Sequence, residues 1–148
     1  MSNEAHFRFL EKLYHSAPIN KDFFQGSKIA VRESSSIIEL KVVEKFHHAG
    51  NAMHGAVYFK LMDDAAYFAS ASVEEVFFIL TKSYQIEFLR PVMTGKIKVT
   101  GTVVSHEEEE TVAIAELFNE KGKLVGRGKG IFVKGHKKLG SFPGFNKY

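Results

Sequence analysis

The longest helical pattern in the chain runs from Gly55 to Ala71 and is apolar on nearly every side. Its apolar residues recur at three- and four-residue steps, it has no proline, and its only glycine stands at the start. A helix that is apolar around most of its circumference is buried on most sides. Because a small domain has room for only one such element, we expect this helix at the centre of the fold.

Strand patterns lie on both sides of this helix. Ile38, Leu40 and Val42 alternate with other residues, which is typical of a strand with one buried face. A connection is predicted over 20–26 and a short strand over 27–31. The short links between the later strands predict antiparallel neighbours throughout, and a run of strands after one long helix is typical of the α+β class. Four later strands are predicted, over 77–91, 96–105, 111–119 and 124–134.

The two ends of the chain differ from this central pattern. Apolar residues at three- and four-residue steps predict an amphipathic helix over about residues 4–15. The segment 135–148 is a basic tail, which is expected to be mobile unless Phe142 or Phe145 docks. No repeat or long linker divides the chain, so we expect one domain over the whole chain, with its core at about 27–134.

Composition and charge exclude several functional classes. Hydrophobic residues make up 45% of the chain, which is enough for a packed core, and the net charge of +3 comes from scattered basic residues. The sequence therefore does not resemble a nucleic-acid binder, although the charge suits an anionic small molecule. The absence of cysteine excludes disulfides and a cysteine nucleophile. No signal-peptide pattern or membrane-spanning apolar run is present, so we expect no membrane partner and a cytoplasmic location.

The last predicted strand carries Gly126, Gly128 and Gly130 on one face. A stripe without side chains weakens a strand unless something packs closely on it, so we expect it to face the central helix. A glycine-rich phosphate loop is the functional alternative. Such a loop requires a strand–loop–helix context, and that context is absent here.

The start of the central helix is a candidate for binding negative charge. The run His54-Gly55-Ala56 opens the helix, where unpaired N–H groups and the helix dipole favour an anion. Gly55 leaves its amide open to close approach, so it could bind a thioester oxygen and the oxyanion that develops from it. In the structural alternative, Gly55 only eases a tight entry into the helix.

Two adjacent aspartates follow in the same helix. Asp64 stands four residues after Lys60, which predicts an ordinary ion pair on the helix surface. Asp63 lies among apolar neighbours without such a partner, and a carboxylate on an apolar face is costly unless it has a role. Asp63 is therefore either a catalytic carboxylate or a hydrogen-bonded structural one.

Other catalytic chemistries have less support in the sequence. His47, His48 and His54 could be metal ligands, but no cysteine or acidic residue stands nearby at ligand spacing. A serine–histidine–aspartate site has no Gly-x-Ser-x-Gly run to support it. We therefore expect no metal and no cofactor.

The chain resembles the hotdog-fold thioesterases of the PaaI-like group. The resemblance rests on His54-Gly55-Ala56, on Asp63 in an Ala-rich helix, and on Phe88-Leu89-Arg90-Pro91 at the end of a long strand. It covers about 37–134. It implies an antiparallel sheet curled around the central helix, a homodimer formed through that sheet, and hydrolysis of acyl-coenzyme A. A homotetramer built as a dimer of such dimers is also compatible with it.

The resemblance also implies roles for individual residues. Gly55 would supply the backbone N–H for the thioester oxygen, and Asp63 would act as the general base or the nucleophile. Thr81 falls where the family often has a Ser or Thr that helps to hold the attacking water. The substrate-binding residues would be His48, His54 and Ala56.

The chain departs from the family pattern at two positions. Ala56 stands where a second glycine is usual, and His48 stands where the family often has Asn or Gln. The second departure favours an alternative function, a non-catalytic hotdog module that binds acyl-CoA or a fatty acid. An acyl-thioester dehydratase is a weaker possibility, because the expected pairing of a His with a carboxylate is missing.

The spacing along the central helix predicts a site built from two chains. The nine residues from His54 to Asp63 correspond to about 900° of rotation, which is half a turn net. On this reasoning Gly55 and Asp63 point to opposite sides of the helix. A two-fold partner would bring the carboxylate of one chain to the helix start of the other.

Overall fold

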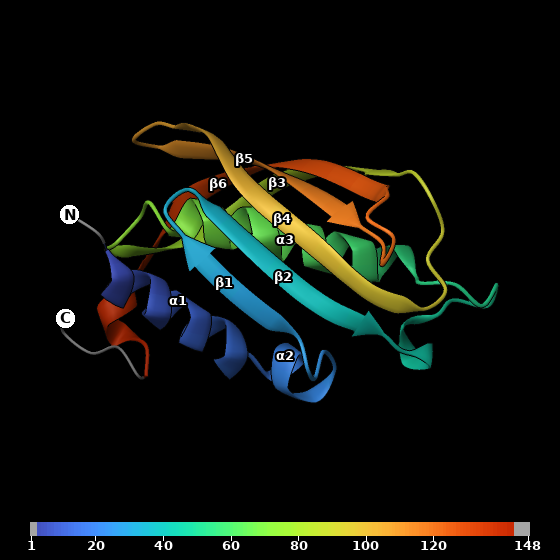
Figure 1. Cartoon of the computed structure of the whole chain (residues 1–148). Coiled ribbons are helices and arrows are strands. Elements are labelled where there is room, and N and C mark those ends of the chain that lie inside the picture. Colours follow the sequence, from blue (N-terminus) through green and yellow to red (C-terminus); the bar gives the residue numbers. More distant parts are fainter. Residues whose placement is uncertain (1–2, 144–148) are drawn as a thin grey trace.

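The computed structural model describes residues 3–143 as a six-stranded antiparallel sheet that wraps around one long helix (Figure 1). The sheet order is β1-β2-β4-β5-β6-β3. The predicted α+β class is confirmed. The strands are β1 (Lys28–Arg32), β2 (Ser35–Val42), β3 (Phe77–Phe88), β4 (Gly95–His106), β5 (Glu110–Phe118) and β6 (Leu124–Lys138). The helices are α1 (Glu4–Ser16), α2 (Pro18–Asp22) and α3 (Gly55–Ala71), with short 3₁₀ turns η1 (Glu44–Phe46) and η2 (Leu139–Ser141). No helix among residues 3–143 is long and apolar enough to cross a membrane.

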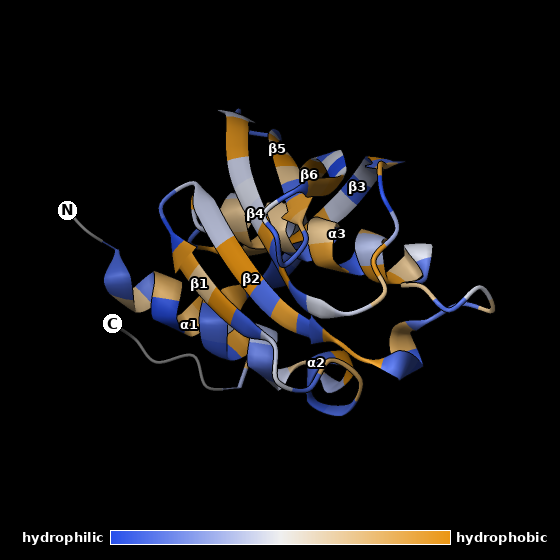
Figure 2. Cartoon of the chain, turned by 45° about the vertical axis from the view of Figure 1, so that its right-hand side comes forward, coloured by the Kyte–Doolittle hydropathy of each residue, from blue (hydrophilic) through white to orange (hydrophobic). Residues whose placement is uncertain are grey.

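The central helix α3 has the predicted bounds and is buried on most sides. The helix and the sheet lie very close together at Gly101 of β4, where an added Cβ would lie 2.0 Å from the carbonyl oxygen of Ala65. Ser36 of β2 donates a hydrogen bond to the same carbonyl at 2.6 Å. Apolar and polar residues alternate along strands such as β2 and β5 (Figure 2). The apolar residues therefore lie on one face of the sheet, and this face covers the helix.

The expectation that β3 and β4 are neighbours is wrong, because β3 pairs with β6 at the far edge of the sheet. The six residues 89–94 are a crossover and not a hairpin. Three strand spacings are about 14 Å, and six extended residues reach about 20 Å, so the link is long enough. It runs past the start of α3, where Tyr58 donates its hydroxyl to the Arg90 carbonyl at 2.6 Å.

The glycine stripe of β6 faces inward, but the helix covers only one end of it. A Cβ added at Gly126 would lie 3.1 Å from Met62 of α3. At Gly128 and Gly130 the nearest atoms include the ring of Tyr84, at 2.5 and 2.6 Å. Tyr84 pairs with Gly130 across β3 and β6, and its ring lies over the missing side chains. The expected close packing by the helix therefore holds at Gly126, whereas at Gly128 and Gly130 the nearest packing comes from Tyr84 of β3.

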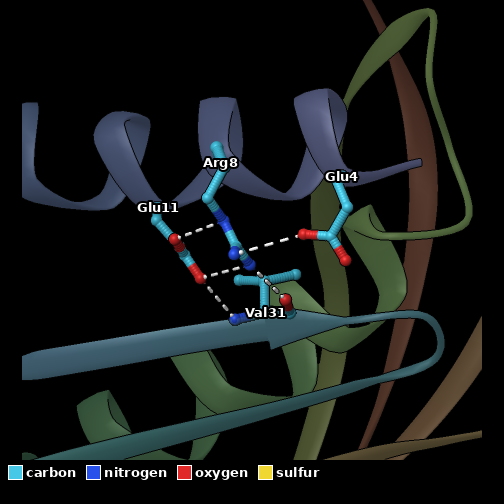
Figure 3. A network of polar contacts seen from close by, with 4 residues as sticks. All are labelled: Glu4, Arg8, Glu11 and Val31. Carbon is cyan, nitrogen blue, oxygen red and sulfur yellow. Dashed lines mark hydrogen bonds and ion pairs between the residues drawn. The ribbon is translucent and has the colours of Figure 1, made fainter. Parts of the chain in front are cut away.

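The N-terminal helix α1 lies beside the outer edge strand β1 (Figure 3). Glu11 accepts a hydrogen bond from the Val31 amide at 2.8 Å, and Arg8 donates one to the Val31 carbonyl at 2.9 Å. These side chains occupy the groups that a further strand would bind, which protects an otherwise open sheet edge. Arg8 also pairs with Glu4, at 3.3 Å, and with Glu11.

Two predicted loop regions contain more structure than the sequence pattern indicates. The expected connection after α1 includes the short helix α2, which begins at Pro18, and proline is favoured in the first helical turn. At the other end, β6 continues four residues beyond the predicted end at Lys134. Phe142 then stacks on Phe78, with ring centroids 5.0 Å apart, so this part of the tail is docked. Phe145 lies outside the described residues.

Candidate active site

The start of α3 is held in place by the loop before it. His54 has extended backbone angles, φ −63° and ψ 144°, and its Nδ1 accepts a hydrogen bond from the Ala56 amide at 2.9 Å. The imidazole therefore caps the helix, as a Ser or Asp side chain does elsewhere. The amide of His54 donates to the Phe46 carbonyl, and the amide of Met53 donates to the Val92 carbonyl of the crossover link, both at 2.8 Å. These bonds fix where the first helical amides point.

Gly55 presents the available amide at this helix start. Its N–H has no hydrogen-bond partner among residues 3–143, whereas the Ala56 amide is occupied by the cap. Gly55 lines a groove of about 390 Å³, together with His48, Tyr58, Phe88 and others. A Cβ at position 55 would lie 3.1 Å from the Phe88 ring, so glycine keeps the approach to this amide open. An unpaired N–H at a helix N-terminus can donate to an oxyanion.

Asp63 and Thr81 meet between α3 and β3. The hydroxyl of Thr81 donates a hydrogen bond to the Asp63 carboxyl at 3.0 Å. Burial raises the pKa of Asp63 to about 6, and the Thr81 hydrogen bond opposes this shift. Smaller opposing contributions come from Asp64, which raises the pKa, and from Lys60, which lowers it. A carboxyl with a pKa near neutrality can both accept and return a proton at physiological pH.

The ion pair of Asp64 and Lys60 forms as predicted, at 2.6 Å, but it is not on the surface. The two side chains are only 23% and 13% exposed, because α1 and α2 cover them. The Lys60 ammonium lies 4.9 Å from the ring centre of Tyr14 and also binds the side-chain oxygen of Asn20. Burial raises the pKa of Asp64, and the charge of Lys60 opposes the shift. Asp64 therefore has a structural role, as the anchor of a buried lysine.

Gly55 and Asp63 open into different cavities of one chain. The groove at Gly55 shares no lining residue with the cavity of about 480 Å³ that Asp63 lines. The half-turn argument needs a correction, because Gly55 is eight residues from Asp63, which leaves about 80° net. What separates the two groups is about 12 Å of axial rise over these residues. A reacting carbonyl must lie within a few ångströms of both its oxyanion donor and its attacking group, and this axial separation is several times larger than that distance.

The histidines near the helix start have local hydrogen-bonding roles. His48 accepts a hydrogen bond from the Gly50 amide at Nδ1, and His47 bonds the Met93 carbonyl through Nε2, at 2.9 and 2.8 Å. The centres of the His48 and His54 rings are 6.4 Å apart, and His48 also lines the Gly55 groove. Within residues 3–143, no three His, Cys, Asp or Glu side chains gather in a way that could hold a metal.

Sequence reasoning misses Tyr84, which lies next to this site. Its hydroxyl is buried and has no hydrogen-bond partner among the described residues. Burial and the charge of Asp63 both raise the pKa of Tyr84, so this side chain stays protonated. Its ring packs edge-on against Phe59 of α3, with ring centres 5.4 Å apart, and it also covers Gly128 and Gly130 of β6. The only signal in the sequence is the glycine stripe opposite it, which is informative once β3 is known to pair with β6.

Comparison with known proteins identifies the family. The sequence model of the thioesterase superfamily matches residues 50–126, which is more than half of the chain and includes Gly55, Asp63 and Thr81. The chain belongs to the thioesterase superfamily. No curated protein sequence matches it significantly.

Solved structures agree on the fold. The PaaI protein of the Escherichia coli phenylacetic acid degradation operon superposes with a TM-score of 0.81 at 20% identity, over 93% of this chain and 99% of that one. A Haemophilus influenzae thioesterase superposes with a TM-score of 0.74 at 19% identity, over 86% of this chain and 88% of that one. Zebrafish thioesterase superfamily member 2 superposes with a TM-score of 0.77 at 18% identity, over 87% of this chain and 98% of that one. The predicted hotdog fold and the PaaI-like resemblance are confirmed.

Proposed function

We propose that the protein hydrolyses acyl-coenzyme A thioesters to a free acid and coenzyme A. The observation that carries the proposal is the Asp63 carboxyl, which is partly buried on α3, bonded to Thr81 and raised in pKa to about 6. The family membership supports thioester chemistry. The free Gly55 amide supplies the second element that acyl transfer needs, a donor for the developing oxyanion.

The active site in this proposal forms between two chains. The partner subunit's Gly55 binds the thioester oxygen, while Asp63 faces the carbonyl carbon. The separate cavities of the two groups within one chain support this arrangement. Each homodimer then has two equivalent sites, as two-fold symmetry requires.

The edge strand β3 is the surface proposed for dimerisation. It bonds to β6 on one side only, and its other edge has no strand neighbour within the described chain. Leu80 and Phe88 of this strand are 51% and 56% exposed, and Phe59 of α3, which packs against Tyr84 of the same strand, is 40% exposed. An open edge with exposed apolar side chains favours pairing with a second copy. Such pairing would bring the two α3 helices to neighbouring positions.

Two routes for hydrolysis fit this geometry. In the first, Asp63 takes a proton from water, the oxygen of that water attacks the thioester carbon, and the C–S bond then breaks. The departing thiolate recovers the proton and leaves as the thiol. In the second, an Asp63 oxygen attacks the carbon and displaces the thiolate, and water then hydrolyses the mixed anhydride. Both routes require Asp63 to be ionised when the reaction begins.

Release of free thiol from a panel of acyl-CoAs tests the proposal. Wild type should release thiol, Asp63→Asn should lose most of the rate, and Asp64→Asn should keep substantial activity. Asn is the matched replacement at both positions, because at position 64 it still offers an oxygen to Lys60. Equal losses in the two variants would refute the choice of Asp63. Binding of acyl-CoA without thiol release by wild type would instead favour the non-catalytic module.

A further inference from the structure

Two contacts between α3 and the edge strand β3 accompany the two groups proposed for the chemistry. At one end, the ring of Phe88 lies beside Gly55, where an added Cβ would be 3.1 Å from the ring. At the other end, Thr81 donates its hydrogen bond to Asp63 at 3.0 Å. From the first contact to the second, the residue numbers rise along the helix and fall along the strand, so α3 and β3 run antiparallel. Each functional group of the helix therefore has its own neighbour on the strand.

Phe59 stands midway between these two groups on the helix. It is four residues after Gly55 and four before Asp63, and residues four apart are neighbours on one helix face. Its ring packs edge-on against Tyr84 of β3, with ring centres 5.4 Å apart. Phe59 and Phe88 are nevertheless 40% and 56% exposed. Large apolar side chains that stay exposed along one open edge mark an interaction surface.

The two edges of the sheet differ in whether a further strand can pair with them. At the β1 edge, Arg8 and Glu11 of α1 already bind the backbone carbonyl and amide of Val31 (Figure 3). At the β3 edge, no strand of residues 3–143 lies on the outer side. Unpaired backbone groups of an edge strand are a template for pairing with another chain. A second copy therefore has β3 available to it, and not β1.

The charges along β3 permit two copies of this strand to lie side by side. Its charged residues are Lys82 and Glu87. Lys82 pairs with Glu110 of β5 at 2.8 Å, and Glu87 pairs with Arg127 of β6 at 2.7 Å. Both ion pairs form within one chain, so a second copy brings no uncompensated charge against the first. The open backbone and the exposed rings therefore favour a second β3 as the occupant of this edge.

A two-fold axis determines which residues meet their own copies. In such a dimer, if one residue contacts a second residue of the partner, the second also contacts the first residue of the partner. The shared site places Gly55 of one chain at Asp63 of the other. The residue midway between them on the helix, Phe59, then lies at the axis and faces the partner subunit's Phe59.

The same axis fixes the register of the two edge strands. Phe88 and Thr81 accompany the two functional groups, so each lies opposite the other across the axis. The strand has one extra residue between them, Lys82, because Thr81 and Ser83 pair with consecutive residues of β6. With the extra residue left out, the midpoint of the strand segment is Gln85, whose side chain is exposed.

We infer that the two-fold axis of the homodimer passes between Gln85 and its copy on the edge strands, and between Phe59 and its copy on the helices. Phe59 is then a positioning residue. Its contact with the partner subunit's Phe59 sets the distance from the oxyanion donor of one chain to the carboxylate of the other. This inference rests on the proposed function, because the shared site supplies the two ends from which both midpoints follow.

Single cysteines test the strand register, because the chain has no cysteine of its own. Gln85→Cys should form a disulfide-linked dimer on mild oxidation, since opposite residues of antiparallel strands have Cα atoms about 4.5–5.5 Å apart, which a disulfide can bridge. Ser83→Cys and Glu87→Cys should not link alone, because each would lie about 14 Å from its own copy. After unfolding and reassembly together, these two variants should link to each other. Ile37→Cys, at a 40% exposed residue of β2, is the control for random collision.

Opposite charges at position 59 test the contact of Phe59 with its own copy. Phe59→Glu and Phe59→Lys each place two like charges together at the axis, so each homodimer should dissociate roughly tenfold more readily than wild type, or more, in sedimentation. A mixture of the two variants should restore both the dimer and the kcat for thiol release, because the charges at the axis are then opposite. Ile37→Glu and Ile37→Lys, at an equally exposed residue away from the axis, should leave dissociation unchanged.

The outcomes separate this inference from the proposed activity. A monomeric wild type, a dimer that Gln85→Cys does not link, or a link between two copies of Ser83→Cys would overturn the register, and thiol release by the same protein would leave the activity standing. Failure of the mixed charges at Phe59 to restore the dimer would overturn the role of that residue. The expected links and charge rescue of the dimer, in a protein that releases no thiol from any acyl-CoA, would uphold the register and refute the activity.

Discussion

Replacing Asp63 by Asn should stabilise the protein at neutral pH while it removes activity. The folded state raises the pKa of this carboxyl from 3.8 to about 6, so between these values the folded protein holds a proton that the unfolded chain has released. Wild-type stability therefore falls as the pH rises from about 4 to above 6. Asn has the same shape and cannot ionise, so the variant escapes this loss.

The expected gain in the free energy of unfolding follows from the pKa shift of Asp63. About two pH units correspond to roughly 3 kcal/mol at most, and the carboxyl is only partly buried, so screening by water reduces this to roughly 1–2 kcal/mol. Urea unfolding at equal protomer concentration, from pH 4 to pH 8, gives the difference between variant and wild type. It should be smallest at pH 4 and grow to its full size above pH 6.

An exposed aspartate provides the control for this experiment. Asp22 is on the surface of α2, and Asp22→Asn tests whether the exchange of carboxyl for amide has an effect of its own. A difference for Asp63→Asn that stays constant from pH 4 to pH 8 would refute the reasoning. So would a wild type that becomes more stable than the variant as the pH rises, because the pKa would then be lowered by folding.

Two further substitutions test the surroundings of this carboxyl. Thr81→Val removes the hydrogen bond that lowers the pKa of Asp63, so the rising limb of the kcat/KM–pH profile should move to higher pH, while Thr81→Ser should keep the wild-type position. Gly128→Val would place a Cβ 2.5 Å from the Tyr84 ring, and overpacking of this kind costs roughly 1–3 kcal/mol. Its thermal midpoint should fall well below that of Lys129→Val, which alters the exposed neighbour on the same strand, and equal midpoints would contradict this packing.

The helix Gly55–Ala71 could be predicted to its end residues because its pattern is complete in the sequence. It is apolar on most sides and begins at a capping residue, and both features are local. The pairing of β3 could not be predicted in the same way. Alternation shows which face of a strand is buried but not which strand lies beside it, and the short link predicted between residues 91 and 96 suggested a hairpin. The true partner explains why Tyr84 covers two glycines of β6.

In the candidate site, too, contacts between residues close in sequence could be predicted, whereas those that depend on tertiary packing could not. The spacing of Lys60 and Asp64 predicts their ion pair, but its burial depends on α2 packing against α3. The hydrogen bond between Thr81 and Asp63 depends on the course of β3 along the helix, which only the resemblance suggested. The roles of Gly55 and His48 in binding a substrate stay predictions, because they depend on a ligand and a second chain.

The most direct test of a shared active site is the mixing of two inactive proteins. Asp63→Asn disables the carboxylate, and Gly55→Pro removes the amide hydrogen while suiting the first helical position. The extended backbone of His54, at ψ 144°, suits a residue that precedes proline. Each homodimer should be nearly inactive, because loss of one oxyanion donor alone costs about 3–4 kcal/mol.

A mixed dimer would contain one site with both defects and one intact site. After unfolding and reassembly of equal amounts, half of the dimers are mixed, so about a quarter of all sites should recover. Thiol release from acyl-CoA should therefore return to about a quarter of the wild-type rate. If every site lay within one chain, each site would keep one defect. Failure of activity to return, in a sample shown by mass spectrometry to contain mixed dimers, would contradict the shared site.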